Sequence, residues 1–141
     1  MGEQLNRPNQ PPTSSAQAPA SIADDIVVRA VIDSSSDIIA AIDRAFRFIA
    51  INRACREEWQ AVFGSPVELG QTLQQCLSHL PAEQEAAVRL CTRALEGERF
   101  SIEQVFGDTD RARKVYQIAI NPLRDNSGAL YGTVISARDI T

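Results

Sequence analysis

Residues 116–141 read YQIAINPLRDNSGALYGTVISARDIT, and they hold the strongest local pattern in the chain. The segments 114–123 and 130–137 have the apolar pattern of two strands. Between them, an Asp-Asn-Ser-Gly sequence beginning at Asp125 supplies residues that favour a tight turn. The stretch therefore predicts a hairpin of two antiparallel strands, followed by Arg138, Asp139, Ile140 and Thr141.

Upstream of this hairpin, short apolar strands and helices follow one another in an order that excludes an alternating parallel sheet. The order is one helix, two strands, three helical pieces and three strands, and it predicts an α+β domain. We expect a five-stranded antiparallel sheet with helices packed on one face, plus an N-terminal amphipathic helix. The remaining predicted elements are strands at 37–42, 47–51 and 100–106, helices that begin at Asn52 and Pro81, and a short helical segment within 70–80.

The two main helices carry recognisable boundary residues. Asn52 can accept a hydrogen bond from a free first-turn N–H, and Gly64 can end the same helix. Pro81 suits a first turn because its missing N–H needs no partner there, and Gly97 can cap the other end. On the first helix, Trp59 is interpreted as a packing residue and not as a ligand-stacking one, because large aromatics dominate core burial.

Residues 37–141 resemble the PAS family in the order of their elements and in the spacing of residues near the end. The residues that stand where the family pattern has them are Tyr116, Pro122, Asp125, Gly128, Gly132, Arg138, Asp139, Ile140 and Thr141. The resemblance implies a sensory domain without catalytic activity of its own. It also implies that residues 138–141 form an output joint, the exit to a kinase, cyclase or transcription module. We expect a module of a longer, bacterial-type signalling protein, in a two-component or cyclic-dinucleotide system.

Before this domain, the chain changes in composition. Residues 1–20 hold four prolines among Gln, Asn, Ser and Ala, and they predict a disordered leader or linker. Residues 21–36 predict a flanking helix that begins at an N-cap, Ser21. Its apolar stripe either packs on its own domain or pairs with the same helix of a second chain, which would make a homodimer. The candidate dimer residues are Ile22, Ile26, Val27, Ala30 and Val31.

The overall charge and the cysteine content exclude several classes of partner and compartment. Fourteen Lys and Arg are dispersed among 18 Asp and Glu, so we expect no binding to nucleic acid or to an anionic membrane. No apolar run reaches the roughly 18 residues of a membrane span. Cys55, Cys76 and Cys91 lack the dense spacing of a secreted disulfide scaffold, so we expect a cytoplasmic protein with reduced thiols.

The candidate ligand residues do not match the pattern of any flavin, haem or metal site. In flavin photosensors of the family a cysteine stands where this chain has Leu73, and in haem sensors a histidine lies on the long helix, whereas His79 precedes Pro81. Cys76 and His79 have C-x-x-H spacing and Cys91 could be a third ligand, but a structural zinc normally takes four. We interpret the cysteines and His79 as packing and surface residues, and we expect neither metal nor catalysis.

Two functions from different classes remain after these exclusions. In the first, the sheet and helices enclose a small ligand whose binding changes how the sheet presents the flanking helix and Thr141. In the second, the domain is a ligand-free module for dimerisation or protein docking. The second gains weight because the large residues expected in the core could fill a small interior by themselves. Those residues are Phe48, Phe100, Phe106, Ile118 and Val134.

Overall fold

The computed structural model describes residues 26–107 and 113–141, which belong to two compact units, Met1–Ser34 and Ser35–Thr141. In the first unit, residues 26–34 form a helix. The predicted leader at 1–20, the N-cap Ser21 and the stripe residue Ile22 lie outside the described residues.

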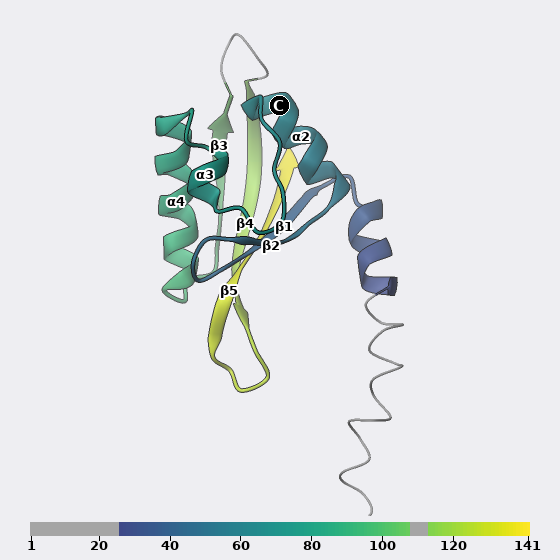
Figure 1. Cartoon of the computed structure of the whole chain (residues 1–141), viewed down its shortest axis with the longest axis vertical. Coiled ribbons are helices and arrows are strands. Elements are labelled where there is room, and N and C mark those ends of the chain that lie inside the picture. Colours follow the sequence, from purple (N-terminus) through teal and green to yellow (C-terminus); the bar gives the residue numbers. More distant parts are fainter. Residues whose placement is uncertain (1–25, 108–112) are drawn as a thin grey trace, which may run out of the picture. The chain divides into compact units, whose positions relative to one another are not determined.

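The second unit contains the predicted five-stranded antiparallel sheet (Figure 1). Its order is β2-β1-β5-β4-β3, so that the first and last strands of the chain pair with each other inside the sheet. The strands are β1 (Ile38–Asp43), β2 (Phe48–Ile51), β3 (Phe100–Phe106), β4 (Lys114–Arg124) and β5 (Leu130–Asp139). The prediction of fold class is confirmed, and most strand ends fall within one residue of the predicted ones.

Three helices of this unit pack on one face of the sheet: α2 (Arg53–Phe63), α3 (Leu73–Cys76) and α4 (Pro81–Leu95). The boundary residues act as predicted. The Asn52 side chain accepts a hydrogen bond from the Cys55 N–H at 2.9 Å, and Gly64 adopts the left-handed conformation that ends α2. Pro81 is the first residue of α4. Among the helices that the structure describes, none is both long and apolar enough to span a membrane.

Asn52 also connects α2 to the sheet, which its role as a cap did not predict. Its side-chain oxygen accepts a second hydrogen bond, from the Ile39 N–H at 3.0 Å, and its amide donates to the Asp37 carbonyl at 2.9 Å. The residue is fully buried. One side chain therefore fixes both the start of α2 and the position of β1 beside it.

Aromatic side chains fill the space between α2 and the sheet. Trp59 packs edge-on against Phe48, with ring centroids 5.5 Å apart, and against Phe63 at 4.7 Å. Phe63 in turn contacts Phe106 at 5.5 Å. These edge-to-face arrangements are the favoured geometry for aromatic pairs. Trp59 therefore packs against the core, as expected, and its indole N–H is buried without a hydrogen-bond partner among the described residues.

Candidate functional site

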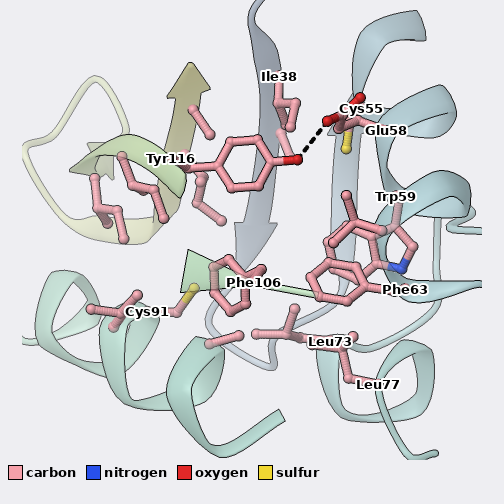
Figure 2. A pocket seen from close by; sticks show the side chains of 18 of the residues that line it. Ile38, Cys55, Glu58, Trp59, Phe63, Leu73, Leu77, Cys91, Phe106 and Tyr116 are labelled. Atoms are coloured by element: carbon pink, nitrogen blue, oxygen red, sulfur yellow. Dashed lines mark hydrogen bonds between the residues drawn. The ribbon is translucent and has the colours of Figure 1, made fainter. Parts of the chain in front are cut away.

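A cavity of about 90 Å³ lies between the helices and the inner face of the sheet (Figure 2). Its wall is almost entirely hydrocarbon and sulfur, because aliphatic and aromatic side chains and two thiols surround it. Side chains from every helix of this unit contribute to it, among them Cys55, Trp59, Leu73 and Cys91. Small-molecule sites in proteins are lined mainly by apolar and aromatic side chains of this kind.

The cavity corrects the prediction that five large residues fill the interior. Phe48, Phe106 and Ile118 line the cavity and Phe100 packs against the core outside it, whereas Val134 does neither. Successive residues of a strand face opposite sides of the sheet, and it is Ile135, next to Val134, that points inward. Phe100 is half-buried under the Arg93 guanidinium, whose carbon lies 3.7 Å from the ring centroid. The remaining side chains leave space that they cannot fill.

A polar cluster adjoins this apolar cavity on one side. Glu58 of α2 and Tyr116 of β4 both line the cavity, and the Tyr116 hydroxyl donates a hydrogen bond to the Glu58 carboxylate at 2.5 Å (Figure 2). Lys114 donates to the same carboxylate oxygen at 2.7 Å. The side chains of Lys114 and Glu58 are 29% and 24% exposed, so the pair is only partly screened by water.

The cluster shifts the proton affinities of its members. Burial, followed by the hydrogen bond to Glu58, raises the pKa of the Tyr116 hydroxyl far above its ordinary value. The hydrogen bond to Glu58 raises the pKa of Lys114. Tyr116 therefore remains a neutral donor, and Lys114 remains a cation, throughout the physiological range of pH.

Lys114 also extends this cluster to the predicted output joint. Its ammonium group lies 3.5 Å from a carboxylate oxygen of Asp139. The other oxygen of Asp139 accepts from the Thr141 N–H at 2.9 Å, and hydrogen bonding to Thr141 is the first cause that lowers the pKa of Asp139. The Thr141 hydroxyl accepts from the Val115 N–H at 2.9 Å, and the Ile140 N–H donates to the Val115 carbonyl at 2.9 Å.

The first residues of the predicted joint lie inside the sheet and not after it, because β5 is two residues longer than predicted. Asp139 is paired with Tyr116, and Arg138 with Gln117. Arg138 also forms an ion pair with Asp37 at 3.1 Å, immediately before β1. This contact joins the end of β5 to the start of β1, two points 101 residues apart in the sequence.

Glu58 and Lys114 were not predicted as site residues, because adjacent acidic residues such as Glu57 and Glu58 usually form a solvated face. Two signals could have identified them. Glu58 lies three residues after Cys55 on α2, and therefore on the face that is buried. Lys114 is two residues before Tyr116, on the same face of β4 as a core residue. A charged residue on a core-facing side needs a partner of opposite charge.

The other candidate ligands for a metal or cofactor are dispersed. Cys76 Sγ lies 3.3 Å from the Gln71 side-chain oxygen, and His79 Nε2 lies 2.8 Å from the Phe63 carbonyl oxygen. Cys91 lines the cavity, where burial raises its pKa to about 12. Within residues 26–107 and 113–141, no group of three or more His, Cys, Asp or Glu could hold a metal ion.

The described part of the candidate dimer stripe is exposed. Ile26, Val27 and Val31 are 66%, 59% and 63% exposed, and Ala30 is exposed as well. Val28, which the predicted stripe does not include, is 54% exposed. Large apolar side chains therefore surround this short helix on more than one side.

Comparison with known proteins identifies the fold. A family model described as a PAS fold matches residues 32–141. The PAS domain of a protein from Colwellia psychrerythraea has a TM-score of 0.62 at 20% identity, with 85% of this chain and 98% of that chain covered. The PAS domain from Bordetella pertussis BvgS has a TM-score of 0.66 at 21% identity, with 84% and 88% covered. Among curated proteins, none matches the chain.

A third solved structure is a larger protein. VqmA from Vibrio cholera, in a complex with a ligand and DNA, has a TM-score of 0.65 at 15% identity. The likeness covers 82% of this chain and 51% of that chain. At these identities the comparison of structures establishes the fold alone.

Proposed function

The chain belongs to the PAS family, and from that premise we propose that it is a sensory module that passes the state of its cavity to the output joint at residues 138–141. The signal is a small molecule in the cavity, and the receiver is an output domain of a signalling protein. The module itself performs no catalysis. Output through the joint changes because the cavity and the joint share a chain of hydrogen bonds.

The observation that carries this proposal is the position of Lys114 between two carboxylates. Glu58 lies on the cavity wall and Asp139 in the joint, and the Lys114 ammonium is 2.7 Å from the first and 3.5 Å from the second. A single ammonium group divides its three donors among its acceptors. Any movement of Glu58 therefore changes how strongly Lys114 binds Asp139.

An occupied cavity moves Glu58 through its neighbours on α2. Cys55 and Val62 line the cavity on the same face of the helix, one turn before and one turn after Glu58. A ligand pressing on these side chains displaces α2 as a unit, because close-packed interiors transmit displacement and do not absorb it. Asp139 then gains or loses its cation, and the hydrogen bond from Thr141 to Asp139 changes with it.

A double-mutant cycle read by NMR tests this connection. We expect Glu58→Gln to move the amide signal of Thr141 in the wild-type background, because Lys114 is released toward Asp139. In a Lys114→Met background, the same substitution should leave the Thr141 signal in place. Glu57→Gln is the matched control, since it removes the same charge from an exposed position one residue away.

Two results would contradict the proposal. One is an equal displacement of the Thr141 signal by Glu57→Gln and Glu58→Gln, which would mean that only the overall charge matters. The other is an unchanged effect of Glu58→Gln when Lys114 is replaced by Met, which would mean that Lys114 does not connect the two sites.

A second candidate function, dimerisation, is favoured by the helix at residues 26–34. Ile26 and Val31 expose most of their apolar surface, and exposed apolar groups of this kind mark interaction surfaces. A second copy of the chain would bury them in a symmetric helix pair. This function is compatible with sensing, because a dimer of sensory modules presents two joints side by side.

A further inference from the structure

The cavity also limits the chemical class of its occupant, an inference that rests on the proposed sensory function. We infer that the occupant is a small, uncharged, apolar molecule of about four non-hydrogen atoms, such as a short hydrocarbon or an apolar gas. The inference depends on three properties of the cavity: its volume, the chemistry of its wall and the state of the polar groups beside it.

Volume sets the size of the occupant. An engineered apolar cavity of about 150 Å³ binds benzene or xenon. The cavity described here is about 90 Å³, and scaling from the six carbons of benzene gives room for roughly four non-hydrogen atoms. A flavin ring system or a haem is many times larger and would need the helices to separate from the sheet.

The wall excludes charged and strongly polar occupants. The side chains that form most of it are apolar, for example Leu73, Leu77, Ile118 and Ile120. A carboxylate or phosphate transferred into such surroundings without a partner loses far more free energy of hydration than it could regain. Water is disfavoured for a related reason, because a buried water needs two to four polar partners.

Apart from the Trp59 indole N–H, which is buried without a hydrogen-bond partner among the described residues, the polar groups next to the cavity offer no free donor to an occupant. The Tyr116 hydroxyl hydrogen is directed to Glu58, and Glu58 also accepts from Lys114. The two thiols on the wall, Cys55 and Cys91, are weak donors, and burial raises the pKa of each to about 12. They behave as small apolar groups and provide polarisable surface for dispersion contacts.

The test uses propane as the probe and propionate as its charged analogue. Propane, dissolved under pressure, should shift the methyl NMR signals of Leu73, Leu77 and Ile118. Its three carbons limit the Kd to no tighter than about 0.5 mM. Propionate at the same concentration should leave these signals in place. Unmoved signals with propane, or equal shifts with propionate, would overturn the inference.

Variants that fill the cavity make the test specific. Ala87 of α4 lines the cavity, and Ala87→Leu adds three carbon atoms there, so propane binding should weaken at least tenfold. Ala82→Leu is the control, because it makes the same change at an exposed position of the same helix. If Ala87→Leu does not fold, Ala40→Val on β1 fills the cavity from the sheet side. Propane binding equal to the wild type in a folded variant would refute the assignment of the site.

Different results would refute the ligand class and the sensory function. Native mass spectrometry of protein from its own host that reveals a larger or charged bound molecule would refute the ligand class and leave the sensory function standing. Propane binding without coupling between Glu58 and Lys114 in the double-mutant cycle would support the ligand class and refute the proposed route to the joint.

Discussion

Gly132 is the position where one added methyl group should cause the largest loss of stability. It lies in β5, where it pairs with Asp43 of β1 on one side and with Leu123 of β4 on the other. A Cβ atom built on Gly132 would stand 2.1 Å from the carbonyl oxygen of Ile42 and 3.2 Å from the Cα of Asp43. Both neighbours are backbone atoms, so no side-chain rotation can relieve the overlap.

The expected loss of stability depends on how far the neighbouring backbone must move. The carbonyl of Ile42 has to retreat by about 1 Å, and over-packed substitutions in close-packed regions cost ~1–3 kcal/mol. Separation of β1 from β5 also weakens adjacent backbone hydrogen bonds, each contributing about 1 kcal/mol. We therefore expect Gly132→Ala to lower the free energy of unfolding by ~3 kcal/mol. For a domain of this size, that corresponds to a melting temperature lower by roughly 12 °C.

Urea denaturation followed by the fluorescence of Trp59, the single tryptophan, measures this loss. Gly128→Ala is the matched control: nothing lies within 4 Å of its added Cβ, but its φ of +87° is unfavourable for any L residue. The control isolates backbone conformation and should cost only ~1 kcal/mol. If Gly132→Ala is no more destabilising than Gly128→Ala, the reasoning from steric overlap is refuted.

Three further predictions concern the core, a helix cap and the flanking helix. Burial raises the pKa of Cys55 and of Cys91 to about 12 from an ordinary 9.0, so above pH 9 only the unfolded chain loses these protons. The free energy of unfolding should therefore fall by roughly 1.4 kcal/mol per pH unit for each thiol between about pH 9 and pH 12, as measured by urea titrations. The same slope in a variant with Ala at both Cys55 and Cys91 would contradict this. Asn52→Ala removes the acceptor of a buried N–H group, that of Cys55, and of a part-buried one, that of Ile39, and should lower stability by ~3 kcal/mol in urea titrations. A loss below about 1 kcal/mol would show that only the cap contributes to stability. Ile26→Asp should weaken the dimer in sedimentation experiments, because it places a charge in an apolar contact, while an unchanged circular dichroism spectrum shows that the domain stays folded. A monomeric wild type, or a dimer that the substitution does not weaken, would rule out this interface.

Local signals were enough to predict the order of the elements and most of their ends. Capping by Asn52, Gly64 and Pro81 acts within one or two turns of their own helix, so this part of their effect does not depend on distant residues. The predicted strand 100–106 has the bounds of β3. The predicted last strand ends two residues before β5 does. The reason is a tertiary contact, because Asp139 stays extended by pairing with Tyr116 in the neighbouring strand.

The candidate site was predicted only in part. The output joint at residues 138–141 stays a prediction from the resemblance of the sequence, and Tyr116 was recognised as a pattern residue without a role. Val134 was placed in the core although it faces away from the cavity, because the apolar residues 134 and 135 do not reveal which of them points inward. The register of β5 against β1 and β4 decides that question.

Local sequence patterns were sufficient to predict the order of helices and strands, which excludes an alternating parallel sheet, and the hairpin that closes the sheet. Tertiary structure alone decided that a cavity of about 90 Å³ remains in the core. It also brought Lys114 to Glu58, 56 residues away. The physical reason is the same in both cases. Local structure depends on backbone hydrogen bonds and caps between near neighbours, whereas packing and charge pairing depend on which distant side chains the completed sheet brings together.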